Sequence, residues 1–257
     1  MSEQGKVYCE RVDAIAYLVI DRGHAHNAIS PSMWLELQSC AELLAGDPDI
    51  HVVLLVSKAE NFTMGFDLHK LASLTVEEVN RSFGHMEAAI CAVESLPQPV
   101  LAVLDGYVLG GGLELAAAAD LRIITPRALI GMPIARLGIL LSPTFAWRLV
   151  ESIGIGYAKD MVFTGRFLTG QEAFEAGFAH RMVEADVLHK EAQLLAERVA
   201  NTPKNAVFRA KQALNEIARS SLNGKSGPFF IDPEIFPKAV QRFTQRSSAS
   251  AEGGLTS

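Results

Sequence analysis

Three consecutive glycines followed closely by a glutamate form the segment of this chain with the clearest chemical potential. Gly110, Gly111 and Gly112 come shortly after the apolar run 99–104, and Glu114 follows within an alanine-rich helical segment. Glycines at a helix N-terminus expose backbone N–H groups, and a nearby carboxylate can carry a proton. Enolate chemistry on a thioester needs both, because donors must stabilise the oxyanion while an acid/base moves a proton. Tight turns and close packing also use glycines, so the run alone leaves both interpretations open.

A second segment, residues 57–68, directly follows the apolar run 52–56. Gly65 allows the backbone to turn sharply there. The N–H of Phe66 could then face the same ligand as the N–H of Gly111, and two converging N–H groups make an oxyanion hole. Asp67 is predicted to cap a helix that begins near Leu68 rather than to act directly in catalysis.

Alternating strands and helices must position these two segments. Apolar and β-branched runs predict strands at 8–12, 15–20, 52–56, 99–104 and 121–124. Ser30 is a predicted N-cap for a helix that ends near residue 47, and further helices are predicted at 76–95, 112–119, 146–153 and 170–176. This alternation indicates the α/β class with a largely parallel sheet, in which ligands bind in loops at strand ends.

The chain beyond residue 179 has a helical pattern. Helices are predicted at 185–200 and 206–218, then a loop at 220–228, a short helix at 233–245 and a disordered tail at 247–257.

Composition narrows the possible functions. A chain of 257 residues, 49% apolar and 20% charged, suits one sizeable core. Its net charge of -6 argues against general nucleic-acid binding, so no nucleic-acid partner is expected. Cys9, Cys40 and Cys91 are widely spaced, which predicts neither disulfides nor a metal site. Without an apolar leader or a run of transmembrane length, we expect a cytoplasmic protein with no membrane span.

Several motifs together resemble the enoyl-CoA hydratase/isomerase, or crotonase, family. Residues 27–30 resemble its early Asn-Ala-Leu motif, and residues 62–68 resemble its Phe-x-Ala-Gly-Ala-Asp-Leu loop. The glycine triplet with Glu114 resembles its Gly-Gly-Gly-x-Glu signature. The order and spacing of these motifs match the family over roughly residues 7–215, which makes the resemblance specific.

The resemblance implies a crotonase-type spiral of ββα turns, with a core at 1–190, a C-terminal helical trimerisation region at 191–246 and a tail at 247–257. Trimers, often paired into hexamers, are implied. The substrate would be an acyl-CoA thioester, with coenzyme A as part of the substrate and no permanently bound cofactor. The implied catalytic groups are Glu114 and the N–H groups of Phe66 and Gly111. The implied substrate-binding residues are His24, Ala28, Met64, Gly65, Phe66, Asp67, Leu68, Lys70, Gly110, Gly111, Pro133 and Ile134, with Lys70 near a phosphate or simply solvated.

The sequence departs from the family pattern at three places. Hydratases of the family usually carry a second glutamate in a Gly-x-Pro-Glu segment, but this chain has Ile134 after Pro133. Bulkier residues at 141–145 replace a glycine-rich turn, which should narrow and dry the acyl pocket. Residues 231–237 replace the usual segment before the last helix, so the acyl length does not carry over.

A single carboxylate beside an oxyanion hole can shift a double bond or protonate an enolate formed by decarboxylation. We therefore expect an acyl-CoA enzyme of isomerase or lyase type that uses Glu114 alone. Two alternatives stay open: an enoyl-CoA hydratase that uses one glutamate, and a non-catalytic acyl-CoA-binding protein.

Overall fold

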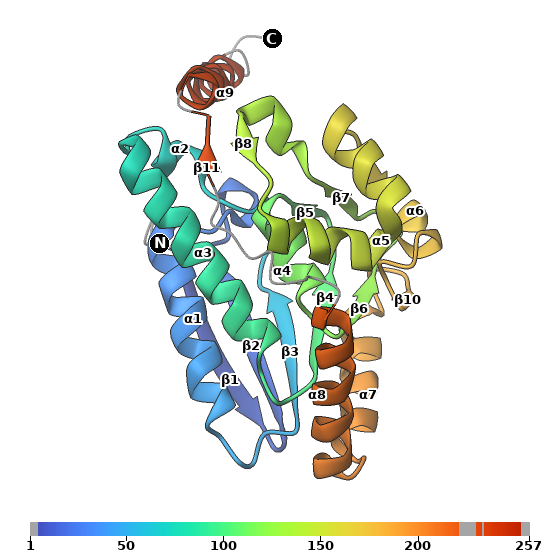
Figure 1. Cartoon of the computed structure of the whole chain (residues 1–257). Helices are drawn as coiled ribbons and strands as arrows, with labels where there is room; N and C mark the ends of the chain where they lie inside the picture. Colours follow the sequence, from blue (N-terminus) through green and yellow to red (C-terminus); the bar gives the residue numbers. More distant parts are fainter. Residues whose placement is uncertain (1–4, 221–229, 233, 253–257) are drawn as a thin grey trace.

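Six strands form the main sheet of the computed structural model, which describes residues 5–220, 230–232 and 234–252 (Figure 1). In spatial order the strands are β1 (Lys6–Val12), β2 (Ile15–Asp21), β3 (Val52–Ser57), β4 (Val100–Leu104), β6 (Leu121–Ile124) and β10 (Arg181–Met182). β1 and β2 are antiparallel and joined through Asp13, whose φ of 53° gives a tight turn. All later neighbours are parallel, which confirms the predicted largely parallel α/β sheet.

Alternating side chains of the strands bury both faces of this sheet. Leu18 and Ile20 of β2 belong to the larger core, which is covered by α1 (Pro31–Ala45) and α3 (Val76–Glu94). Ile15 and Val19 point to the other face and pack with α7 (Leu188–Ala200). Burial on both faces explains why β3 and β4 read as continuous apolar runs rather than alternating ones.

Smaller sheets and short helices build the region around the candidate site. β5 (Tyr107–Leu109), β7 (Leu129–Gly131) and β9 (Phe167–Thr169) form one sheet, and β8 (Ile139–Leu140) pairs with β11 (Phe230–Ile231). The sequence did not predict these short strands, which lack a long apolar pattern. The remaining elements are η1 (Ala25–Asn27), α2 (Leu68–Leu71), α4 (Gly111–Ala117), η2 (Pro133–Leu137), α5 (Pro143–Thr164), α6 (Gly170–Glu175), α8 (Lys204–Ser220) and α9 (Ile235–Glu252).

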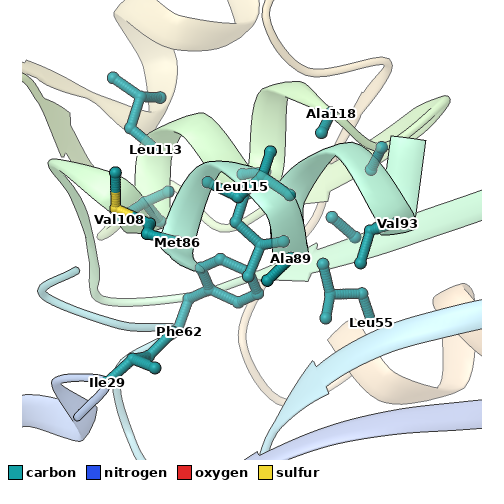
Figure 2. Packing of buried hydrophobic residues seen from close by; sticks show 14 of the residues in the cluster. Ile29, Leu55, Phe62, Met86, Ala89, Val93, Val108, Leu113, Leu115 and Ala118 are labelled. Carbon is teal, nitrogen blue, oxygen red and sulfur yellow. The ribbon is translucent and has the colours of Figure 1, made fainter. Parts of the chain in front are cut away.

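α3 and α4 pack together where the core meets the glycine-rich segment. Figure 2 shows Met86 and Ala89 of α3 close to Leu115 of α4, with Phe62 beneath them. This packing fixes the start of α4, and therefore the N–H groups of the glycine run, against the core of the molecule.

Two helices, α5 and α9, extend well beyond their predicted bounds. α5 begins at Pro143 because Ser142 caps it, with the Phe145 N–H donating to Ser142 Oγ at 3.1 Å. It continues to Thr164 past Gly154, whose φ of 72° interrupts the helix at the predicted end. α9 reaches Glu252, so residues 247–252 of the predicted disordered tail are helical. The predicted loop at 220–228 lies outside the described residues beyond Ser220, as do residues 253–257.

Candidate active site

The loop after β3 and the loop before α4 touch each other at Gly65. A Cβ on Gly65 would lie 2.5 Å from the carbonyl oxygen of Leu109 and 2.8 Å from the backbone N of Gly111. Gly65 also has a φ of 85°, which side chains other than glycine rarely adopt. The contact continues as a parallel bridge, in which the N–H of Leu109 donates to the Thr63 carbonyl at 3.1 Å. Both glycine segments therefore meet as the sequence predicts.

The two predicted oxyanion donors lie on either side of this contact. Gly111 is the first residue of α4, where backbone N–H groups have no partner within the helix. Phe66 forms an isolated parallel bridge with Ile29. The hydrogen bonds of this bridge are made by the neighbours of Phe66: the Asp67 N–H donates to the Ile29 carbonyl at 3.0 Å, and the Gly65 carbonyl accepts from the Ile29 N–H at 2.7 Å. Within the described chain, neither the Phe66 N–H nor the Gly111 N–H donates a hydrogen bond to protein. Both donors are thus available to a ligand.

A mainly apolar cavity of about 450 Å³ opens beside these donors. Seven of the predicted substrate-binding residues line it: Met64, Phe66, Leu68, Gly110, Gly111, Pro133 and Ile134. Ile134, in the place of the second glutamate, is 6% exposed. Phe145, from the bulkier segment 141–145, also lines the cavity. The cavity is thus lined mainly by apolar side chains, and among its lining residues are Phe66 and Gly111, whose N–H groups have no acceptor in the described part of the protein.

Glu114 does not belong to the described lining of this cavity. Its residue exposure is 0%, and its Oε1 accepts a hydrogen bond of 2.7 Å from Nη1 of Arg148 in α5. Its Oε2 is buried and has no hydrogen-bond partner in the described structure. Glu114 follows Gly111 by three residues, so both lie on the same face of α4, one helical turn apart.

Burial raises the pKa of Glu114 well above the ordinary glutamate range, and the negative charge of Glu87 raises it further. The positive charge of Arg148 opposes these effects. The causes that raise the pKa outweigh Arg148, because water is fully excluded from the carboxyl group. Glu114 is consequently suited to hold a proton and to act as a general acid.

Two of the predicted residues have structural roles. Asp67 caps α2 by accepting from the N–H groups of His69 and Lys70 at 3.0 and 3.2 Å, which confirms its predicted capping role. Its other oxygen forms a buried ion pair of 2.7 Å with Arg22. Gly65, as shown above, provides the close approach of the two loops.

His24, Ala28 and Lys70 are not among the described residues that line the cavity. His24 and Lys70 are exposed, whereas Ala28 is 7% exposed and accepts a hydrogen bond from Arg22 through its carbonyl oxygen. Their predicted contacts with coenzyme A, like the solvated alternative for Lys70, stay predictions.

Several lining residues were not singled out from the sequence. Phe83 and Met86 are three residues apart on α3, and this spacing was a detectable signal of a shared face. Ala239 and Arg242 of α9 line the cavity from a part of the chain whose position the sequence does not reveal. Arg148 carried no signal, because an arginine inside a predicted helix is usually exposed.

Neither a metal site nor a membrane span is found in the described part of the chain. No group of three or more His, Cys, Asp or Glu side chains there could hold a metal ion. None of the helices searched combines the length and apolar character needed to cross a membrane.

Comparisons with known proteins identify similar sequences and structures. The model of the enoyl-CoA hydratase/isomerase family matches residues 10–228. The chain is 37% identical over 204 residues to YngF of Bacillus subtilis, an enoyl-CoA hydratase/isomerase by name, covering 79% of this chain and 78% of YngF. It is 30% identical over 214 residues to the crotonyl-CoA hydratase of Syntrophomonas wolfei, covering 82% and 81%.

Solved structures show the same fold. An enoyl-CoA hydratase/carnithine racemase from Magnetospirillum magneticum superimposes with a TM-score of 0.79 at 27% identity, over 84% of this chain and 81% of that one. The converging donor loops, the apolar cavity and these matches lead to one conclusion: the chain belongs to the enoyl-CoA hydratase/isomerase family.

Proposed function

We propose that this protein catalyses enolate chemistry on an acyl-CoA thioester, as an isomerase or a lyase of decarboxylase type. The N–H groups of Phe66 and Gly111 hold the thioester oxyanion, and Glu114 moves the proton. The observation that supports this proposal is a pair of N–H donors that have no acceptor among the described residues and that belong to two residues lining an apolar cavity. Donors fixed in advance stabilise a charge that develops only during the reaction.

Ile134 favours proton transfer over water addition. Addition of water to an enoyl thioester requires groups that activate the water and move the α-proton, and a hydrocarbon side chain does neither. Ile134 stands at the wall of the cavity, among Met64, Leu68 and Phe145. A pocket lined in this way holds an acyl chain well and an attacking water poorly.

Glu114 supplies its proton from behind the oxyanion donors. Its raised pKa keeps the carboxyl group protonated at pH values where an exposed glutamate is ionised. After decarboxylation, the C–C bond electrons form the enolate that the oxyanion donors stabilise, and the Glu114 proton passes to its carbanion carbon. In isomerisation the ionised form of Glu114 must first take the proton that it later returns to another carbon. Either transfer requires the Glu114 side chain to turn from Arg148 toward Gly111, since Glu114 is outside the described lining of the cavity.

Two other functions each have a specific observation in their favour. The name of the Syntrophomonas wolfei relative, a crotonyl-CoA hydratase, favours hydration with a water held by Glu114 alone. The complete burial of Glu114 against Arg148 favours a non-catalytic acyl-CoA-binding protein. Incubation of the purified protein with 2-enoyl-, 3-enoyl- and malonyl-type CoA thioesters, followed by mass spectrometry and chromatography, separates these functions.

A shifted double bond or a loss of carbon dioxide is the expected result. Gain of one water molecule as the main product would establish the hydratase instead. Retained binding without any conversion would establish the binding protein.

Replacement of the proton donor tests the role of Glu114. Glu114→Gln keeps the shape of the side chain but removes the transferable proton, so we expect turnover to fall by about 10²-fold or more. Binding of coenzyme A thioesters, measured by calorimetry, should remain within a few-fold of the parent. Glu175→Gln is the matched control, because Glu175 is an exposed residue that bonds only to Gln171 in the described structure. Unchanged turnover in Glu114→Gln would reject the role proposed for this residue.

A further inference from the structure

Arg148 gathers three glutamates in the interior of the molecule. Its side chain is 1% exposed, and its Nη1 donates both to Glu87 Oε1 at 2.8 Å and to Glu114 Oε1 at 2.7 Å. Its Nε and Nη2 donate to the two oxygens of Glu94 at 3.2 and 3.1 Å. Glu87 and Glu94 come from α3, whereas Glu114 comes from α4. One guanidinium therefore connects three acidic side chains from two helices.

The charges in this cluster do not balance when every group is ionised. Among the described residues, the second cation paired with the cluster is Arg219 of α8, which lies 3.1 Å from Glu94 and has a 43% exposed side chain. Lys211 also attracts Glu94, but its own charge is balanced by Asp120, which lies 2.7 Å away. Cys91 of α3 also touches Arg148 and Glu87, but burial raises the pKa of this thiol to about 11, so it is neutral near neutral pH. The three carboxylates thus exceed the two guanidinium groups by one negative charge.

The excess charge falls on Glu87 and Glu114. Both carboxylate oxygens of Glu94 accept hydrogen bonds, and the donors come from the guanidinium groups of Arg148 and Arg219. Glu87 and Glu114 share the single Nη1 of Arg148, and each keeps a buried Oε2 without a hydrogen-bond partner in the described structure. A buried carboxylate oxygen without a donor is costly, and two such oxygens of like charge are costlier still. One proton placed between these groups removes the excess charge and supplies the missing donor.

We propose that Glu87 is a positioning residue for Glu114: the two carboxyl groups, bridged by Nη1 of Arg148, share one proton, and Glu87 keeps that proton on Glu114 for delivery to the substrate. The carboxyl group that is paired with Glu114 thus comes from α3, outside the described lining of the cavity, and does not take the place of a glutamate at Ile134. The sharing of the proton stands on the geometry of the cluster, whereas its delivery rests on the proposed function.

The proton balance of the delivery is simple. The O–H bond of Glu114 breaks while a C–H bond forms at the enolate carbon, and the enolate electrons form that bond as the thioester carbonyl is restored. Glu114 is left as a carboxylate that accepts from Arg148 and faces the negative charge of Glu87. One proton from water then returns to the pair. Glu87 is the natural entry point, because its side chain is 20% exposed whereas that of Glu114 is fully buried.

Infrared difference spectroscopy during a pH titration tests the shared proton without any substrate. The parent protein should show the carbonyl band of a protonated buried carboxyl group at neutral pH, and Glu114→Gln should lack it. In Glu87→Gln the band should titrate about one pH unit lower or more, because the neighbouring negative charge is gone. Glu94→Gln is the matched control: it also removes a bond to Arg148, but in the described structure Glu94 makes no hydrogen bond to Glu114, so the shift should be clearly smaller.

Absence of the band from the parent, or equal shifts in Glu87→Gln and Glu94→Gln, would overturn the proposal. Glu87→Asp serves as a second variant, because the shorter side chain keeps its negative charge but holds it farther from Glu114. The band in this variant should titrate at a pH between those of the parent and Glu87→Gln. If the protein turns over a thioester, its activity should require protonated Glu114. The pH at which activity is lost should therefore be lower in Glu87→Gln than in the parent. A confirmed titration without turnover of any thioester would reject the proposed function and leave the shared proton standing.

Discussion

Gly65 is the residue on which the spacing of the two oxyanion donors depends. A methyl group at this position would approach the Leu109 carbonyl oxygen to 2.5 Å and the Gly111 backbone N to 2.8 Å. We expect Gly65→Ala to push the donor loops apart and to reduce turnover by about 10²-fold, the typical cost of losing one oxyanion donor. The strained φ should also cost about 1–3 kcal/mol of stability. Steady-state kinetics and urea denaturation measure the two effects.

Gly46→Ala provides the control, since a Cβ at Gly46 has only an ordinary contact at 3.7 Å and the φ of this residue is -84°. Turnover in that variant should match the parent. Normal turnover in Gly65→Ala would mean that the two loops do not form the oxyanion hole.

Glu114 should also make stability depend on pH. Its pKa is raised in the folded protein, so between the ordinary glutamate pKa and the raised value the folded state binds more protons than the unfolded state. Stability from this group is therefore fully present below the ordinary pKa and is lost as the pH rises through the raised one. We expect the free energy of unfolding to depend less steeply on pH in Glu114→Gln than in the parent. Urea denaturation at a series of pH values measures this dependence. An identical slope in parent and variant would contradict the raised pKa.

The residue types that were predictable from the sequence are those whose role is local. Gly65, Gly111 and Asp67 act through backbone conformation or a cap within a few residues, and such roles leave a pattern in the sequence. The ion pairs of Arg148 were not predictable in this way, because they join residues that are 34 to 61 positions apart in the sequence. Nothing in the spacing of Glu87, Glu94 and Glu114 shows that one arginine will reach all three.

At the scale of elements, α5 connects α3 and α4 through a single buried side chain. Arg148→Met would fill a similar volume but leave Glu87, Glu94 and Glu114 without their shared cation. Breaking a buried ion pair on one side typically costs about 3–5 kcal/mol, and we expect a loss of this order in the free energy of unfolding. Urea denaturation measures it at neutral pH.

Arg81→Met is the control for this loss, because Arg81 pairs with Glu77 on the exposed surface of α3, where a pair is worth about 0–1 kcal/mol. Equal losses in the two variants would show that the buried cluster contributes nothing special. A partial recovery of stability by Arg148→Met at acidic pH would fit protonation of the carboxylates that the variant leaves unpaired.

The sequence predicted long elements better than short ones. Continuous apolar runs located β3, β4 and β6 to within about one residue of the observed strands. The three residues of β5 carry too little pattern, and β5 forms because its neighbours in space, β7 and the loop at Thr63, offer hydrogen bonds. The site therefore combines predictable loops with strands that only the assembled fold defines.

At the scale of the whole molecule, α8 presents apolar side chains outward. Leu214 is 67% exposed and Ile217 is 72% exposed, whereas Lys211 of the same helix is buried. In Figure 1, α8 stands beside α7 at one end of the molecule, far from α9 at the other end. An amphipathic helix normally buries its apolar face, so this outward face requires a partner surface.

A second copy of the chain is the partner that we expect for α8, as the family resemblance implies trimers or hexamers. Sedimentation equilibrium should give a mass about three or six times the 27.8 kDa of one chain. Lysine at both Leu214 and Ile217 would place two charges in this interface and should shift the protein to smaller species, because an unpaired buried charge costs several kcal/mol. Lysine at Leu43, a 74% exposed residue of α1, should leave the mass unchanged. A parent protein with the mass of one chain would refute this assembly and leave the exposed face of α8 to a different partner.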